Sequence, residues 1–293
     1  MNIHHIARTG GRLSAVLKEE MGVSANQMNR LKWKDGILVN GKPEHTDFPV
    51  LPGDRVTLLL DAPAPEYPAE DLPITILYED DQLLAVDKPS GMLVHPSHCQ
   101  FTGTLANRVI GYFQRTCQSS AFHPVTRLDR DTYGIVLLAK NPVIHAKLHA
   151  LHRQGMLQKT YHALVYGAPP QDHGLIDAPI ARRPLPSLLR YVNSDGKPSL
   201  TSFSVLERRN GCTKLSLRPI TGRTHQLRLH CAHMGFPILG DPQYTTPEAA
   251  ACSAALGLQS QLLCAVSLEF PHPVTGEGMR LCSQMDAELP QRF

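Results

Sequence analysis

The sequence predicts an α+β protein in which a small helix–hairpin domain precedes a larger domain built around a sheet. Helical spacing followed by two tight turns fills the first 60 residues. Residues 61–73 then hold four prolines and four acidic residues, a composition typical of an extended linker. Beyond them, buried and alternating strand patterns recur along the chain. We therefore expect a small domain at 1–62, a linker at 63–73 and a large domain at 74–293.

The small domain begins with two helical segments. Apolar residues recur at helical intervals over 13–21, and Gly22 is placed to cap the end of that helix. Ser24 is a suitable N-cap for a second helix that ends at Lys32. We expect the apolar side chains of this helix to face inward. The basic side chains expected to face outward are Arg30, Lys32 and Lys34.

Two turn signals follow these helices. Asn40-Gly41 after a short apolar run is a strong indication of a hairpin, and Pro52-Gly53-Asp54 precedes a last strand. This order resembles the small RNA-binding module shared by a ribosomal protein and many RNA-modifying enzymes. The resemblance implies that the three outward basic residues bind RNA. The alternative is a helix–hairpin domain whose lysines are only solvated.

The large domain should contain several strands and one well-marked helix. Asn141 is expected to cap that helix, with Pro142 in its first position and its end near Gly155. Continuous apolar runs favour strands buried on both faces, whereas alternation favours strands with one exposed face. On these criteria we expect strands at 74–78, 83–86, 135–139, 158–167, 201–207 and 213–220.

A dense polar turn lies at 126–134, directly before the apolar strand. Gly134 tolerates the positive φ angle that a turn can require. Arg127 and Asp129 should therefore lie at the lip of the sheet, where a rigid backbone aims the carboxylate. A cluster of solvated surface ion pairs is the alternative interpretation, because such pairs are common and contribute little.

The same turn resembles the catalytic motif of the RluA-type pseudouridine synthases, HRLDxxTSG followed by an apolar strand and Ala-Lys. The catalytic Asp of that motif corresponds to Asp129. Thr126 stands where His is usual, and Tyr133 stands where Ser is usual. We expect these departures to affect efficiency or to narrow the set of RNAs accepted. His123, three positions before Thr126, is a candidate for a compensating imidazole.

Three further segments resemble motifs of this family, in the family's order. Residues 87–96 are similar to NKPAGxxVHP, and residues 159–167 are similar to KxYxALVxG. Residues 222–241 match GRTHQLRxHxAxxGxPILGD at every specified position. In the closing segment, residues 262–276, Cys264 stands where His is common.

The resemblance implies a large mixed, mainly antiparallel sheet and an RNA pseudouridine synthase. Such an isomerase breaks the glycosidic bond of a uridine and rejoins the base through carbon 5, and a carboxylate can serve as the nucleophile. By correspondence Asp129 is that nucleophile, Arg228 holds it ionised, and Tyr161 offers a flat face and a phenol that can accept a proton. Arg127 corresponds to an arginine that helps fill the space of an extruded nucleotide. Arg223 is expected to be a further RNA contact.

The expected partner is therefore RNA, and ribosomal RNA is favoured over transfer RNA, although both are substrates among such enzymes. The alternative function is a non-catalytic RNA-binding or RNA-folding factor with the same fold. The presence of both Asp129 and Arg228 favours catalysis. The charge distribution agrees with an RNA partner. Residues 90–293 carry 20 basic and 12 acidic residues, an excess of positive charge that suits a phosphate-binding surface, whereas residues 61–89 carry 1 basic and 8 acidic residues.

We expect neither a metal nor a cofactor. Histidines four residues apart on a helix can bind metal, but no Glu lies between His145 and His149 as it would in HExxH. The remaining metal interpretation is a zinc hydrolase that uses the histidines and the cysteine of the 222–241 segment. The candidates weighed in this way are His145, His149, His152, His225, His230, Cys231 and His233.

The sequence also bears on compartment and assembly. Its seven cysteines are scattered and form no CxxC, which favours a reducing compartment. No apolar run approaches the ~20 residues of a membrane span, and the first residues lack the apolar core of a signal peptide. We expect a cytoplasmic monomer.

Overall fold

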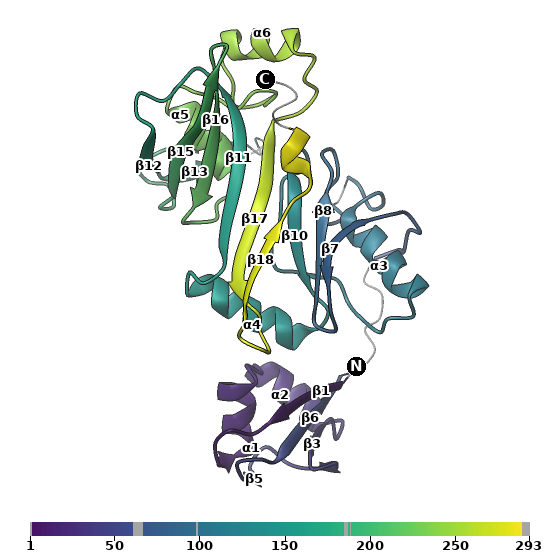
Figure 1. The fold of residues 1–293 in the computed structure, drawn as a ribbon. Helices are drawn as coiled ribbons and strands as arrows, with labels where there is room; N and C mark the ends of the chain where they lie inside the picture. The colour runs from purple at the N-terminus through teal and green to yellow at the C-terminus, as the bar shows by residue number, and fades with distance from the viewer. Residues whose placement is uncertain (1, 61–66, 98, 185–186, 188, 289–293) are drawn as a thin grey trace.

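The structure is a computed structural model that describes residues 2–60, 67–97, 99–184, 187 and 189–288. A four-stranded sheet lies in the first 60 residues, and a ten-stranded sheet extends through the rest of the chain (Figure 1). The large sheet has the strand order β12-β15-β16-β11-β17-β10-β8-β7, with β18 and β9 paired to β17 and β10. Among its described pairs only β10 and β17 run parallel. The expected α+β class with a mixed, mainly antiparallel sheet is confirmed.

The small sheet follows the expected turns and adds a strand at the N-terminus. The elements are β1 (Asn2–Ile6), β2 (Gly11–Arg12), α1 (Leu13–Ala15), a π-helix (Val16–Glu20), α2 (Ala25–Lys32), β3 (Ile37–Val39), β4 (Lys42–Pro43), β5 (Pro49–Val50) and β6 (Arg55–Leu59). Strand β1 pairs with β6 and was not expected. Its only buried residue is Ile3, so its sequence carries no alternating apolar pattern.

The local signals of the small domain hold in the structure. Ser24 accepts a hydrogen bond from the backbone of Gln27, whose side chain accepts one from the Ser24 backbone. Asn40 and Gly41 both have positive φ angles, as a two-residue hairpin turn requires. The capped helix and the hairpin are therefore confirmed.

The elements of the large domain are β7 (Thr75–Glu79), β8 (Leu83–Lys88), α3 (Leu105–Arg115), β9 (His123–Pro124), β10 (Tyr133–Ala139), α4 (Pro142–Arg153), β11 (Gln158–Tyr166), β12 (His173–Asp177), β13 (Ile180–Arg182), β14 (Arg190–Val192), β15 (Leu200–Arg209), β16 (Cys212–Pro219), α5 (Gln226–His233), α6 (Pro247–Ala255), β17 (Leu263–Pro271), β18 (Gly278–Cys282) and a 3-10 helix (Met285–Glu288). The expected strands and the helix capped by Asn141 are all present. Helices α3, α5 and α6 were not expected.

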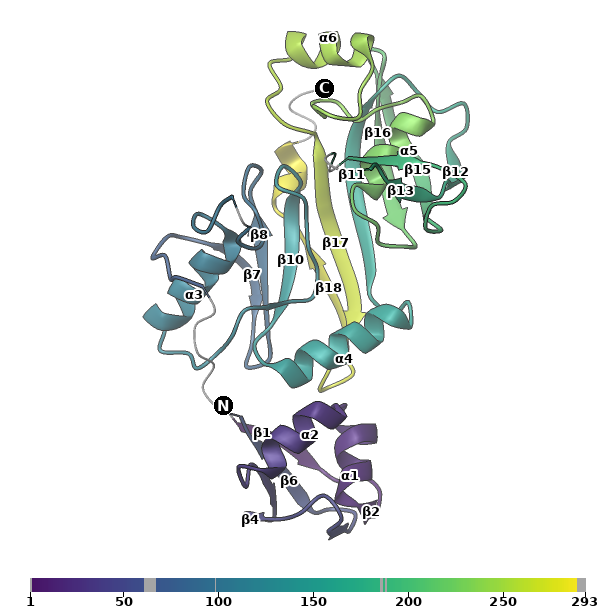
Figure 2. The same cartoon turned by 180° about the vertical axis from the view of Figure 1, so that it is seen from behind.

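Strand β10 is buried on both faces, which explains its continuous apolar sequence. Ile135 and Leu137 pack with Ile144 and Leu148 of α4. Val136 and Leu138 pack instead in a cluster that contains apolar residues of α3. Figure 2 shows α3 and α4 against the part of the sheet that contains β8 and β10. The expectation of a strand covered on both sides is confirmed.

The expected linker lies partly outside the described residues, because positions 63–66 are not among them. Its described part, 67–73, contacts the beginning of α3. The side chain of Asn107 donates a hydrogen bond to the carbonyl of Pro68 at 2.8 Å. The backbone of Gly103 donates another to Glu70 at 2.7 Å. These contacts tie the segment that precedes β7 to the large domain.

Gly134 lies where β10 passes closest to β17. Its φ angle is +106°, and a Cβ atom there would lie 2.4 Å from the carbonyl oxygen of Ala265. A Cβ in the left-handed region costs about 1–2 kcal/mol, and overpacking adds about 1–3 kcal/mol. The strand pair thus requires glycine at this position.

We expect Gly134→Ala to destabilise the protein by about 2–5 kcal/mol. Gly167→Ala is the matched control, because Gly167 has a φ angle of +79° and no atom within 4 Å of the added Cβ. The control should lose only the backbone contribution, about 1–2 kcal/mol. Urea denaturation followed by circular dichroism measures both. Equal losses would contradict the close contact with Ala265.

Candidate active site

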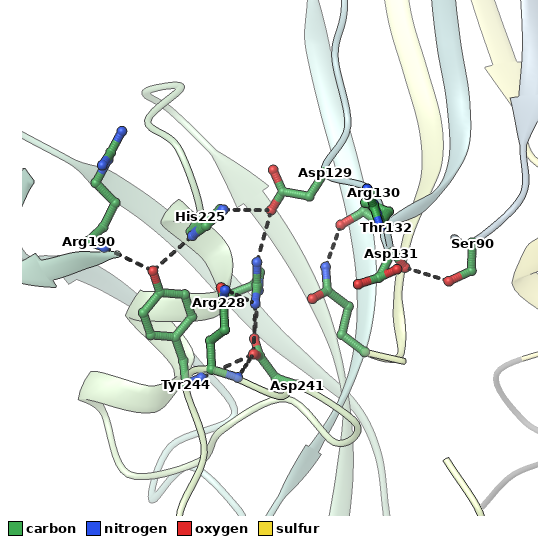
Figure 3. Close-up of polar contacts among 12 residues, drawn as sticks. Ser90, Asp129, Arg130, Asp131, Thr132, Arg190, His225, Arg228, Asp241 and Tyr244 are labelled. Carbon is green, nitrogen blue, oxygen red and sulfur yellow. Dashed lines mark hydrogen bonds and ion pairs between the residues drawn. The ribbon is translucent and has the colours of Figure 1, made fainter. Parts of the chain in front are cut away.

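The candidate site lies where the polar turn before β10 faces α5. Strands β10, β17 and β11 are neighbours in the sheet, and Gly134 and Tyr161 are both register partners of Ala265, on its two sides. The turn holds Asp129 above this row. Helix α5, which follows β16, approaches the turn and brings Arg228 toward it (Figure 3). The structure therefore joins residues that lie 99 positions apart in the chain.

Asp129 has two carboxylate oxygens in different surroundings. Oδ2 accepts a hydrogen bond from Nη1 of Arg228 at 3.4 Å and lies 3.9 Å from Nε2 of His225. Oδ1 has no hydrogen-bond partner among the described residues, and Figure 3 shows it pointing away from Arg228. The side chain is 33% exposed. One oxygen is therefore held, and the other is open to a substrate.

Arg228 lies between two carboxylates but binds one of them more closely. Its Nε and Nη2 donate to the two oxygens of Asp241 at 2.6 and 2.8 Å, and Nη2 also donates to Gln243 at 3.0 Å. The guanidinium lies 5.0 Å from the centre of the Tyr244 ring. Burial lowers the pKa of Arg228, but Asp241, Asp129 and Tyr244 together outweigh burial, and the pKa is raised. The guanidinium stays charged beside Asp129.

Lys88 links the segment similar to NKPAGxxVHP to the polar turn. The side chain is fully buried, and Nζ donates to the carbonyl oxygens of Pro89, Met92 and Arg130 at 2.8–2.9 Å. Burial lowers the pKa of Lys88 to about 7, against the opposing charges of Asp131 and Asp129. Sequence reasoning assigned no role to Lys88. A lysine at the end of a buried apolar strand is the sequence signal that its Nζ binds backbone carbonyls inside the protein.

Thr126 fixes the start of the polar turn through its hydroxyl group. The backbone N–H of Leu137 donates to Oγ1 of Thr126 at 2.9 Å, and Thr126 is buried. His123 pairs with Ala139 at the end of β10, and its ring lies 5.5 Å from the ring of His145 on α4. Compensation by His123 for the missing imidazole stays a prediction.

The second departure, Tyr133, is explained by its neighbour. Tyr133 and Cys264 are direct register partners in the parallel pair β10–β17, and both are buried in one apolar cluster. The family more commonly has Ser at the first position and His at the second. A larger residue on β10 is thus matched by a smaller one on β17. The two departures form one packing change.

This pairing predicts non-additive effects on stability. Tyr133→Ser alone should leave a cavity and cost about 3 kcal/mol or more. Cys264→His alone should overpack the cluster and cost about 1–3 kcal/mol. The double variant should lose less than the sum of the two, by about 0.5–3 kcal/mol. Thermal and urea unfolding of the wild type, the two single variants and the double variant measure these losses of stability. Strictly additive losses would contradict the pairing of Tyr133 with Cys264.

Tyr161 is buried in the core cluster beneath the site. Its hydroxyl has no hydrogen-bond partner among the described residues, and Asp129 lies close enough to affect its ionisation. Burial first, and the charge of Asp129 second, raise the pKa of Tyr161 well above its usual value. The phenol is therefore protonated at neutral pH. This favours a role as a flat wall and hydrogen-bond donor over the role of proton acceptor.

The other expected RNA contacts lie on the surface. Arg127 is exposed near Lys159 of β11, whose pKa falls to about 8 because of burial first and the charge of Arg127 second. Arg223 is exposed, and its Nε donates to the carbonyl of Pro198 at 3.2 Å. Arg30, Lys32 and Lys34 are exposed at and after the end of α2, in the small domain. The structure thus brings together Asp129, Arg228 and Tyr161, and it places Arg30, Lys32 and Lys34 in the small domain.

Several of the histidines considered as metal ligands contact protein groups. His149 and His145 contact each other at 3.0 Å between their Nε2 atoms, and His145 also contacts the carbonyl of Pro124. His230 is buried between Thr201 and the carbonyl of Ala178. Within the described ranges no three His, Cys, Asp or Glu side chains are grouped so as to hold a metal ion. No helix in those ranges is both long and apolar enough to cross a membrane.

Besides Lys88, the sequence reasoning missed three residues of the candidate site: Asp241, Tyr244, and His225, which it considered only as a metal ligand. Asp241 lies within the best-matched motif, 13 positions after Arg228, yet its role as the closest partner of Arg228 depends on the fold. Tyr244 lies just beyond that motif. His225 has a φ angle of +58°, which directs its ring toward Asp129. The motif alone indicates neither the contact between Asp241 and Arg228 nor the positive φ angle of His225.

Comparisons with known proteins show the family in which this fold and this carboxylate–guanidinium site occur. The family model described as RNA pseudouridylate synthase matches residues 82–233. An uncharacterized RNA pseudouridine synthase of Bacillus subtilis, YlyB, is 36% identical over 88% of this chain and 84% of its own length. Ribosomal large subunit pseudouridine synthase D of Haemophilus influenzae is 32% identical over 90% of this chain and 84% of its own length.

A solved structure, human RNA pseudouridylate synthase domain containing 1, superposes with a TM-score of 0.60 and 26% identity, over 73% of this chain and 84% of that one. The chain belongs to the RNA pseudouridylate synthase family, in its RluA-type branch. It is therefore an isomerase that acts on RNA.

Proposed function

We propose that this enzyme isomerises uridines of ribosomal RNA with Asp129 as its nucleophile. The observation that carries the proposal is the asymmetric carboxylate of Asp129. Oδ2 is held by Arg228, while Oδ1 has no partner among the described residues. A nucleophile that must attack one carbon needs this combination of fixed orientation and an open oxygen.

In the proposed reaction, the target uridine leaves the RNA stack and enters the space beside Asp129. Oδ1 attacks the sugar or the pyrimidine ring, and the bond between the sugar and nitrogen 1 breaks. The base turns and rejoins the sugar through carbon 5, and the bond to Oδ1 breaks, which frees the carboxylate. Carbon 5 then loses its proton and nitrogen 1 gains one, so that the product is an isomer of the substrate. Arg228 keeps the carboxylate ionised and aimed. Tyr161 forms a flat wall, and its protonated phenol can donate a hydrogen bond to the turning base. Exclusion of water protects the intermediate from hydrolysis.

We expect Asp129→Asn to abolish pseudouridine formation, to below about a hundredth of the wild-type rate, with little change in RNA affinity. An amide keeps the shape of the side chain but is no nucleophile. Asp131→Asn is the matched control, because Asp131 belongs to the same turn but has no contact with Arg228 or His225 among the described residues. Tritium release from labelled uridine RNA under single-turnover conditions measures both. Asp129→Asn turnover above that limit would contradict the nucleophile assignment.

The choice of ribosomal RNA rests on the relatives. Several of them are named ribosomal large subunit pseudouridine synthase D. Mapping pseudouridines in ribosomal and transfer RNA from cells with and without the gene tests the choice. Sites lost only from transfer RNA would redirect the proposal to that substrate. The monomeric state and the cytoplasmic location expected from the sequence stay predictions.

We further propose that the small domain binds the RNA through the C-terminal end of α2. Arg30, Lys32 and Lys34 are exposed there, and Trp33 between them is 86% exposed. Basic side chains bind phosphates, and an exposed aromatic ring can stack on an unpaired base. Trp33 is also the only tryptophan of the chain, so its fluorescence reports on this surface alone.

We expect bound substrate RNA to quench the fluorescence of Trp33. Replacing Arg30, Lys32 and Lys34 together by alanine should weaken binding and reduce the slope of log affinity against log salt by about 2–3. Arg55→Ala is the control, since Arg55 is an exposed basic residue on β6 of the same domain. Unchanged fluorescence together with unchanged affinity would show that this surface does not contact the RNA.

A further inference from the structure

His225 lies beside Asp129 in a backbone conformation that side chains rarely adopt. It precedes α5 with a φ angle of +58°. This left-handed conformation is uncommon outside glycine, although Asn, Asp and His are found in it more than other residues. The conformation places Nε2 3.9 Å from Oδ2 of Asp129, the same oxygen that Arg228 contacts (Figure 3). The ring is mostly buried.

The other side of the ring is held by Tyr244. Nδ1 of His225 lies 2.8 Å from the Tyr244 hydroxyl, and that hydroxyl accepts a hydrogen bond from the backbone N–H of Arg190 at 3.1 Å. The Tyr244 backbone in turn donates to Asp241, the closest partner of Arg228. A closed ring of contacts therefore runs through Asp129, Arg228, Asp241, Tyr244 and His225.

These contacts favour one tautomer of His225. Because the Tyr244 oxygen accepts from Arg190, its own O–H is available to donate to Nδ1. Nδ1 is then the acceptor, and the ring proton is on Nε2, facing the carboxylate of Asp129. The opposite tautomer would direct the Nε2 lone pair at a carboxylate oxygen, which is electrostatically unfavourable. Both neighbours of the ring thus favour the same proton position.

The charges around His225 favour its neutral form. Burial lowers the pKa of His225, and Arg228 and Arg190 lower it further, whereas Asp129 and Asp241 raise it. The net shift is downward from 6.5, so the imidazole is neutral at pH 7. A neutral ring can still donate one hydrogen bond, and it does not cancel the negative charge that a nucleophile needs.

We propose that His225 is a positioning residue whose Nε2–H, set by Tyr244, fixes Oδ2 of Asp129 together with Arg228 and so directs Oδ1 at the substrate. The separation of 3.9 Å is longer than a hydrogen bond. Contacts of this kind in empty active sites often tighten when the substrate binds. The proposal rests on the function of Asp129 proposed above and adds a second donor to its orientation.

Two substitutions of His225 separate the two sides of the ring. The amide nitrogen of Gln lies as many bonds from Cα as Nε2, so His225→Gln can keep a donor toward Asp129. The amide of Asn reaches only as far as Nδ1, so His225→Asn can keep the contact with Tyr244 and loses the donor. Asn is the better tolerated residue at this φ angle, so backbone strain works against the expected order of activities.

We expect His225→Asn to reduce the single-turnover rate at saturating RNA about ten- to a hundredfold, and His225→Gln to keep most of that rate. RNA affinity should stay within about threefold of wild type for both, because the effect is on orientation and not on binding. Thermal unfolding identifies any variant that fails to fold. If the two variants are equally active or equally impaired, the Nε2 donor does not position Asp129.

A spectroscopic measurement tests the same proposal without RNA or turnover. The ¹⁵N signals of His225 in the wild-type protein, identified by their loss in His225→Gln, should show a protonated Nε2 and an unprotonated Nδ1 at neutral pH. Tyr244→Phe should produce a mixture of tautomers and lower the single-turnover rate severalfold. A wild-type Nδ1–H tautomer, or an altered tautomer with an unaltered rate, would overturn the proposal. Failure of the proposed function itself would appear instead as an active Asp129→Asn enzyme.

Discussion

The buried pair of Arg228 and Asp241 is the interaction on which the geometry of the site depends. The Arg228 side chain is 6% exposed and the Asp241 side chain is fully buried, so neither charge can rely on water. A buried charge without a partner is strongly destabilising, and the two parallel N–H···O bonds between them supply that partner. With the guanidinium fixed in this way, its remaining Nη1 points at Asp129. The second carboxylate is thus positioned by the first.

The same buried carboxylate also organises the chain that follows it. Asp241 accepts hydrogen bonds from the backbone of Gln243 and of Tyr244, which turns this segment back toward α5. Tyr244 then lies against both Arg228 and His225. On the other side of Asp129, the buried Lys88 ties down the carbonyl of Arg130. The turn that carries Asp129 is therefore held from both sides by buried side chains, those of Arg228 and Lys88.

Local features of the fold were predictable because their causes are local. The caps at Ser24 and Asn141 and the turn at Asn40-Gly41 depend on residues within three or four positions of each other. The apolar run of β10 also identified a strand covered on both faces. Strand β1 could not be found in this way, because its partner β6 lies 53 positions away and only Ile3 is buried. Its pairing is a property of the folded domain.

The candidate site likewise contains residues that the sequence could identify and residues whose roles required the structure. The resemblance between motifs identified Asp129, Arg228 and Tyr161 as site residues. It did not show which contacts bring them together in the fold. The roles of Lys88, Asp241 and His225 needed the structure, because each depends on a partner from another part of the sheet or on a φ angle that sequence does not display. The expectation that Asp129 and Arg228 face each other agrees with the structure, but Asp241 is the closer partner of Arg228.

The two departures from the family's catalytic motif can now be separated from the choice of RNA. Thr126 and Tyr133 are 3% and 5% exposed, so neither side chain is available to contact an RNA directly. Thr126 binds the backbone of Leu137, and Tyr133 packs against Cys264, so both act beneath the turn that carries Asp129. Any effect of these residues on substrate choice has to pass through the position of that turn. The surface that carries the exposed basic residues, Arg127 among them, is the one expected to contact the RNA. Differences in RNA preference between this enzyme and its relatives should therefore be sought on that surface rather than in the altered motif.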